Sequence, residues 1–124
     1  MINNIENLPL NIVGFRVLET VDEKDFTETV MPEVEALISK INNLNYLLVL
    51  DTSITNFTFG VWIKDALMGI KHLTKWNRAA IVTDVNGIRN FTEFFSKVMP
   101  GEFRAFQHKD LQYAIDWTSE KSNT

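Results

Sequence analysis

Tyr46-Leu47-Leu48-Val49-Leu50 is an unbroken apolar run, and the rest of the chain is organised around it. Such a run is typical of a strand that is buried on both faces, as in parallel sheets. At Asp51 the chain turns polar, and from Trp62 onward apolar residues recur at the three- and four-residue steps of a helix. The stretch from Tyr46 to Trp76 therefore predicts a strand, a polar loop and a helix. In open α/β sheets such a loop lies at the carboxyl end of a strand, where ligands usually bind.

Working outward, the same alternation of strand and helix patterns continues on both sides. Parallel strands are expected over Ile12–Thr20, Asn45–Leu50, Arg78–Thr83 and Glu102–Phe106. Met1–Glu6 is expected to add an antiparallel edge strand through a turn at Leu8-Pro9-Leu10-Asn11, which makes an N-terminal β-hairpin.

Segments whose apolar residues recur at helical spacing separate the expected strands. The first predicted helix follows Asp22, a good N-cap, and ends at Asn42-Asn43. Pro32 is expected to kink or divide this helix. Further such segments follow Trp62, span Ile88–Met99 and begin at Asp110. The fold class predicted is α/β: one domain over residues 1–124, with a mixed, mostly parallel five-stranded sheet and about four helices.

Composition narrows the classes of function. The net charge of −4 argues against nucleic-acid binding, which needs a basic surface. The chain has no cysteine, so disulfides and cysteine metal sites are excluded. It shows no secretory signal pattern, and no apolar run approaches the ~20 residues that cross a bilayer. We therefore expect a cytoplasmic protein.

Signatures of catalysis are missing from the sequence. It contains no glycine-rich phosphate loop and no nucleophile elbow, and His72 and His108 share no metal-ligand spacing. We therefore expect no catalytic residue, no metal, no cofactor and no enzymatic activity. Asp65 and His72 lie two helical turns apart. They form a carboxylate–imidazole pair with a chemical role, a structural hydrogen bond or simply an exposed pair.

Aromatic residues near the expected helix starts suggest an apolar ligand site. The candidate ligand-binding residues are Phe57, Trp62, Asp65, His72, Phe91, Phe94 and Phe95. The last three belong to Ile88–Met99, which we interpret as a mobile lid with hinges at Val85-Asn86-Gly87 and Pro100-Gly101. An ordinary core helix is the alternative.

Basic residues gather in the same region. Lys64, Lys71 and Lys75 are candidates for contact with anionic lipid headgroups, and a solvated helix face is the alternative.

Several short segments, taken in order, resemble the bacterial SpoIIAA-like proteins. They are Trp62-x-x-Asp65, Gly69-x-x-His72, Arg78-Ala79-Ala80-Ile81-Val82-Thr83-Asp84, Ile88-Arg89, Met99-Pro100-Gly101-Glu102-Phe103-Arg104-x-Phe106 and Ala114-x-x-Trp117. The resemblance implies the STAS-type fold of anti-anti-sigma factors and kinship with the CRAL-TRIO lipid-binding fold.

The chain departs from the anti-anti-sigma pattern at one motif. Those proteins carry an Asp-Ser-Ser-Gly-like motif with a phosphorylated serine. Here Asp51 is retained, but no Ser or Thr directly precedes a glycine. We therefore predict that Ser53, Thr55 and Thr58 form helix caps and turns and are not a regulatory phosphosite.

These observations predict a non-enzymatic binding module for an apolar ligand or a membrane surface. A STAS-like regulator that acts through protein interactions and lacks the phosphorylation motif is the alternative. The expected partners are accordingly an apolar small molecule or lipid, an anionic membrane at the inner face, and a protein partner or second copy, but no nucleic acid.

Overall fold

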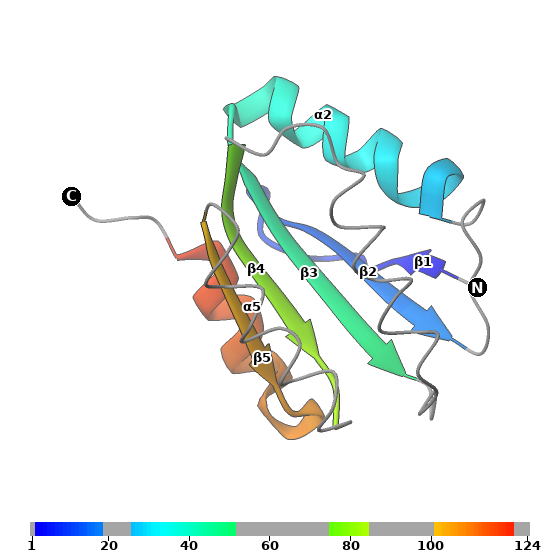
Figure 1. The fold of residues 1–124 in the computed structure, drawn as a ribbon, viewed down its shortest axis with the longest axis vertical. Coiled ribbons are helices and arrows are strands. Elements are labelled where there is room, and N and C mark those ends of the chain that lie inside the picture. Colours follow the sequence, from blue (N-terminus) through cyan, green and yellow to red (C-terminus); the bar gives the residue numbers. More distant parts are fainter. Residues whose placement is uncertain (1, 19–25, 52–74, 85–100, 121–124) are drawn as a thin grey trace.

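A mixed sheet forms the centre of the protein. The computed structural model describes residues 2–18, 26–51, 75–84 and 101–120. Its strands are β1 (Ile2–Asn4), β2 (Val13–Leu18), β3 (Leu44–Asp51), β4 (Trp76–Val82) and β5 (Glu102–Phe106). They lie side by side in sequence order, with β1 antiparallel to β2 and every other pair parallel (Figure 1). The predicted five-stranded mixed sheet is confirmed.

Two α-helices fall within the described ranges. They are α2 (Met31–Ile41) and α5 (Leu111–Ser119), each preceded by a short irregular turn: the π-helical η1 (Phe26–Val30) and the 3-10 helical η3 (His108–Asp110). The sequence predicted about four helices. The two further ones, after Trp62 and over Ile88–Met99, lie outside the described residues, so two helices rather than four are observed.

The sequence predicted that Pro32 kinks or divides the first helical segment. The structure shows no break: the segment changes from π-helical to α-helical at Met31, and Pro32 is the second residue of α2. The π-helical turn η1 occupies the residues before α2. The helix ends at Asn42, whose left-handed backbone (φ 61°) lets its N–H donate to the Ile38 carbonyl at 2.8 Å.

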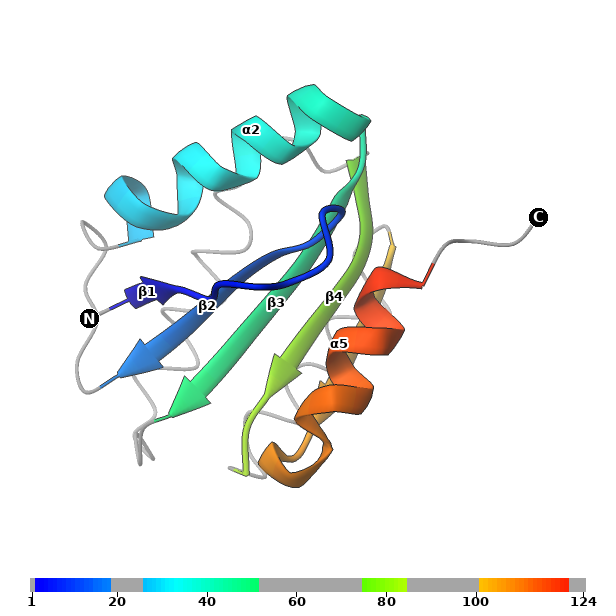
Figure 2. The same ribbon diagram turned by 180° about the vertical axis from the view of Figure 1, so that it is seen from behind.

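The two α-helices lie on opposite faces of the sheet, as the views from front and back show (Figure 2). Side chains of successive strand residues point to alternate faces, so a run that is apolar throughout buries both sets. In β3, Leu48 faces α2, while Leu47 and Val49 face α5. Leu48 and Ile81 are only 3% and 1% exposed, which confirms them as core residues of the two central strands.

The link between β1 and β2 is wider than a tight hairpin turn. The predicted turn is present, with the Ile12 N–H donating to the Pro9 carbonyl at 3.2 Å. Before the turn the link crosses the sheet on the α5 face, where Ile5 and Leu8 pack against the core (Figure 2). Gly14 leaves space there for the Leu8 side chain.

Some element bounds differ from the prediction because polar residues are accommodated within strands. β4 begins at Trp76 rather than Arg78, and its Asn77 amide donates to Asn45 Oδ1 at 2.8 Å. Asn45 in turn donates to the Asn11 carbonyl at 2.9 Å. This ladder satisfies side chains that would otherwise disfavour a strand. At the other end of the described chain, α5 ends at Ser119.

Candidate functional site

An aromatic row crosses the sheet on the face that α2 covers. Each of the four parallel strands contributes one ring: Phe15 from β2, Tyr46 from β3, Trp76 from β4 and Phe103 from β5. The centroids of successive rings are 5.8, 5.8 and 5.1 Å apart, within the range of favourable aromatic pairs. We call these four residues the aromatic row.

The aromatic row contains a polar atom that has no partner among the described residues. Trp76 is only 5% exposed, and its buried indole Nε1–H forms no hydrogen bond with any residue that the structure describes. An unsatisfied buried donor costs about 1–3 kcal/mol, so an acceptor brought to this position would be stabilised. Burial also raises the pKa of Tyr46, so its hydroxyl stays protonated and remains a hydrogen-bond donor.

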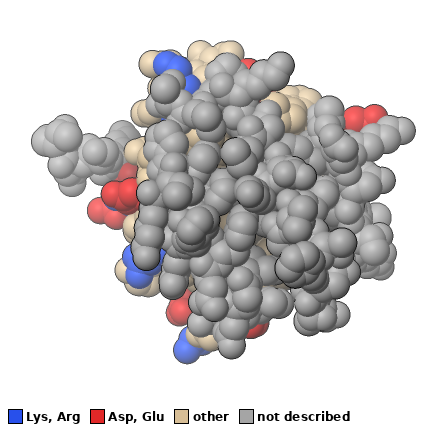
Figure 3. All heavy atoms as spheres, in the orientation of Figure 1, with Lys and Arg blue, Asp and Glu red and all other residues tan. Residues whose placement is uncertain are grey.

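Helix α2 packs against only half of the sheet width. Its buried residues Val34, Leu37 and Ile38 join the core on the side of β2 and β3. Trp76 and Phe103 belong to β4 and β5, on the other half of the same face. In the space-filling view of this side, the visible charged side chains of described residues lie around its margin (Figure 3). Within the described ranges, no acidic or basic residue is buried.

The opposite face carries a different aromatic group, built on α5 and β5. The Arg104 guanidinium lies over the rings of Phe106, Tyr113 and Trp117, at 5.0, 5.3 and 5.9 Å from their centroids. Tyr113, Asp116, Trp117 and Glu120 line an open hollow of about 570 Å³ beside these rings. We call the surface formed by Arg104, Tyr113, Asp116 and Trp117 the α5 surface.

Arg78 fastens the end of α5 to the sheet. Its Nη1 donates to the Trp117 carbonyl at 2.6 Å and to Glu120 Oε2 at 3.2 Å, and its Nε lies 3.3 Å from Glu102 Oε2. The guanidinium also lies 4.9 Å from the centroid of the Trp117 ring. These contacts fix the position of α5 relative to β4 and β5.

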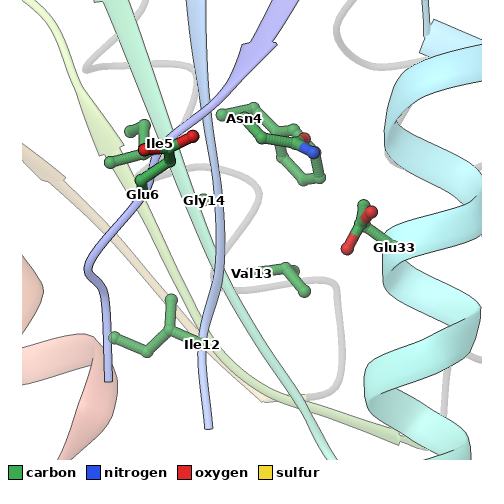
Figure 4. A pocket seen from close by; sticks show the side chains of 8 residues that line it. Asn4, Ile5, Glu6, Ile12, Val13, Gly14 and Glu33 are labelled. Atoms are coloured by element: carbon green, nitrogen blue, oxygen red, sulfur yellow. The ribbon is translucent and has the colours of Figure 1, made fainter. Parts of the chain in front are cut away.

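A smaller pocket lies where β1 leaves the edge of β2. It has a volume of about 290 Å³ and is bounded by Glu33 of α2 on one side and by the β1–β2 link on the other (Figure 4). Among the residues that the structure describes, no group of three or more histidine, aspartate or glutamate side chains could hold a metal ion.

A histidine–carboxylate pair lies at the carboxyl ends of β4 and β5. Asp84 accepts a hydrogen bond from the His108 backbone N–H at 3.1 Å, and its second oxygen lies 3.1 Å from His108 Nδ1. The pair joins the residues that follow β5 to the residues that follow β4. The sequence pointed instead to Asp65 and His72, which both lie outside the described residues.

Almost all residues predicted to form the site fall outside the described ranges. These are Phe57, Trp62, Lys64, Asp65, Lys71, His72, Phe91, Phe94 and Phe95. Lys75 is described; it is partly buried and directly precedes β4. None of the helices within the described ranges is long and apolar enough to cross a membrane.

Sequence reasoning missed the aromatic row because its members lie on four separate strands. Within each strand, the aromatic residue has the appearance of an ordinary core position. The sequence nevertheless offered one indication that Trp76 is unusual: it stands beside the polar pair Asn77 and Arg78 at the start of β4.

Comparisons with known proteins agree with this fold. The family model described as SpoIIAA-like matches residues 12–119. A solved structure of an uncharacterized DUF3478-family protein from Shewanella loihica PV-4, described as having a SpoIIAA-like fold, is 20% identical in sequence. It superposes with a TM-score of 0.62, covering 94% of this chain and 93% of the other. No match was found among curated proteins. The sheet order, the match over most of the chain and the structural likeness lead to one conclusion: the chain belongs to the SpoIIAA-like family.

Proposed function

We propose that this protein is a non-enzymatic binding module that takes a neutral apolar molecule on the α2 face of its sheet. The observation that carries the proposal is the buried, unpartnered Nε1–H of Trp76 within the aromatic row. A ligand that brings a hydrogen-bond acceptor to this atom would remove an unfavourable unsatisfied donor. A SpoIIAA-like fold is compatible with a regulatory or interaction module that senses such a ligand.

The chemistry of the aromatic row favours a neutral acceptor over a charged one. The buried polar residues within the described ranges are Asn45, Thr83 and Thr118, and none of them carries a charge. A buried carboxylate without a cationic partner is strongly disfavoured. An ester, ketone or alcohol oxygen on a long apolar molecule fits these surroundings better than a free fatty acid does.

The expected helix over Ile88–Met99 would complete the site. It connects β4 to β5, which are parallel neighbours, and such connections are almost always right-handed. The same rule applied to α2 between β2 and β3 favours one common face for both connections. We therefore retain the proposal of a lid that carries Phe91, Phe94 and Phe95 toward Trp76 and Phe103. Together with the helix expected after Trp62, it would raise the number of helices to about four.

Binding can be tested with a pyrene-labelled fatty acid methyl ester and the corresponding free acid. We expect saturable binding of the ester to the wild type, with weaker binding of the acid. Trp76→Phe should weaken ester binding by about two- to tenfold, the value of one hydrogen bond. Tyr113→Ala, which alters an aromatic residue on the opposite face, serves as the matched control and should bind as the wild type does. Absence of saturable binding, or equal affinity of Trp76→Phe and the wild type, would refute the proposal.

Membrane contact remains part of the proposal. Lys64, Lys71 and Lys75 would add about 1 kcal/mol each near anionic headgroups, and an open lid would expose its phenylalanines to lipid. Liposome co-sedimentation of the wild type and Phe94→Ser, with and without anionic lipid, measures this contact. Wild type that stays in the supernatant with every liposome would rule it out.

A protein-interaction regulator is the second candidate, because the α5 surface leaves aromatic residues exposed. Tyr113 is 54% exposed, and its ring and that of Trp117 border the open hollow. Surfaces with accessible tyrosine, tryptophan and arginine are typical of protein contacts. Such a regulator would act without the phosphorylation switch of anti-anti-sigma factors. Phosphorylation of Ser53, Thr55 or Thr58 at stoichiometric levels in cells would contradict this.

A further inference from the structure

We propose that the α5 surface binds a second copy of this chain and forms a two-fold symmetric dimer. This inference concerns the face opposite the aromatic row and does not depend on ligand binding there. In a two-fold interface the same patch meets itself, so each group on one copy needs a complementary group elsewhere on the same patch. The α5 surface meets this requirement in its aromatic residues and in its charges.

The aromatic part of the patch includes one strongly exposed ring, that of Tyr113, beside the partly buried Trp117. Tyr113 is one of only two large hydrophobic residues in the described ranges that are strongly exposed. Its ring lies 5.5 Å from that of Phe106, which in turn lies 5.7 Å from Trp117. Arg104 packs against all three rings, so the group is held in place before any partner arrives. Such pre-organised aromatic and arginine groups lose little conformational entropy on binding.

The charged part of the patch has one base and one acid that form no ion pair with any described residue. Arg104 contacts aromatic rings but forms no ion pair or hydrogen bond with any residue that the structure describes. Asp116 accepts a hydrogen bond from Gln112 at 3.0 Å and pairs with no described base. The neighbouring charges differ, because Arg78 is already paired with Glu102 and Glu120.

A two-fold axis near Tyr113 and Trp117 would give both Arg104 and Asp116 an ion-pair partner. Arg104 of each copy would meet Asp116 of the other, so that the interface gains two equivalent ion pairs around a centre of aromatic rings. An arginine guanidinium is well suited to this role because its planar fork binds a carboxylate through two N–H groups. An unrelated partner would need to supply an acid and a base at matching positions. A second copy carries both, because it presents the same Arg104 and Asp116.

The dimer can be tested by sedimentation velocity over a concentration series at low salt. We expect the wild type to dimerise. Arg104→Asp and Asp116→Arg should each raise the dimer dissociation constant by about tenfold or more, because each brings like charges together. The equal mixture of these two variants should dimerise again, since every altered charge then faces an opposite one. The double variant Arg104→Asp/Asp116→Arg should dimerise for the same reason.

Several results would overturn the proposal. Wild type that stays monomeric up to millimolar concentration excludes the dimer. Single variants that dimerise as the wild type does would place any dimer on another face, as would a mixture and a double variant that both stay monomeric. Lys40→Asp, a charge reversal at the end of α2, is the matched control and should leave the dimer intact. Circular dichroism of each variant checks its fold, and ester binding in the single variants reports separately on the aromatic row.

Discussion

At the scale of single residues, the burial of Tyr46 makes stability depend on alkaline pH. Burial raises the pKa of Tyr46 above its ordinary value of 10.0, so the folded protein keeps a proton that the unfolded chain releases. The free energy of unfolding is therefore unaffected by this group below about pH 10. Above that pH it falls by up to about 1.4 kcal/mol per pH unit. Urea unfolding of the wild type and Tyr46→Phe across this range should show a shallower decline for the variant. Equal slopes for the two proteins would contradict the assignment.

Gly101 is a second residue whose role follows from local geometry. Its φ of 88° lies in the left-handed region, and a Cβ built on it would stand 2.7 Å from the Trp76 carbonyl oxygen. Gly101→Ala should therefore lower the free energy of unfolding by roughly 1–3 kcal/mol, because the backbone at Trp76 cannot move aside without disturbing the start of β4. Gly14→Ala is the control. Its new Cβ would meet the flexible end of the Leu8 side chain. The decrease in the free energy of unfolding, measured by urea titration, should therefore be smaller than for Gly101→Ala.

At the scale of elements, β3 and β4 each contribute more buried core residues than any other described element. Leu48→Ala and Ile81→Ala should each cost roughly 2–5 kcal/mol, because each removes a buried side chain and leaves a cavity on the α2 face. Leu10→Ala provides the comparison, since Leu10 is 81% exposed and its truncation should change the urea midpoint little. A midpoint that hardly moves in Leu48→Ala or Ile81→Ala would show that the predicted central strands are not central.

These strands could be predicted from sequence because burial on both faces requires a continuous apolar run, and Tyr46–Leu50 is such a run. β3 was predicted from Asn45 and begins at Leu44, but the start of β4 was not predicted. Asn77 disfavours a strand when taken singly, and its hydrogen bond to Asn45 satisfies its side chain within β4. A disturbance of the helix near Pro32 was foreseeable, because proline lacks the N–H that a helix interior uses, and the helix changes from π to α type beside it.

The candidate site was less accessible to sequence reasoning than the fold. Phe15, Tyr46, Trp76 and Phe103 come from distant parts of the chain, and parallel register across β2, β3, β4 and β5 brings them into one row. The unsatisfied Nε1–H of Trp76 is a property of packing that no local pattern predicts. The same holds for Arg104, which packs on the rings of α5 and β5 and has no acidic partner among the described residues.

At the scale of the whole molecule, the two faces of the sheet are mechanically linked. Leu47 and Val49 belong to the core under α5, whereas Leu48 and Leu50 belong to the core under α2, and all four alternate along β3. Loss of packing on one face therefore displaces the strand that supports the other. Arg78 adds a second link, since it joins β4 to the end of α5. We infer that the two cores unfold as one cooperative unit.

Cooperative unfolding can be measured with a probe on one face and a mutation on the other. In Trp62→Phe/Trp76→Phe, Trp117 is the remaining tryptophan and reports on the α5 face. Leu48→Ala introduced into this background removes packing on the α2 face only. Small single domains usually unfold in one transition, so Trp117 fluorescence and far-UV circular dichroism should show the same lowered urea midpoint. The contrary result would be a Trp117 transition that keeps its original midpoint while the circular dichroism transition shifts. It would mean that α5 and its core unfold independently, because the central strands do not transmit the loss of packing from the α2 face to the α5 face.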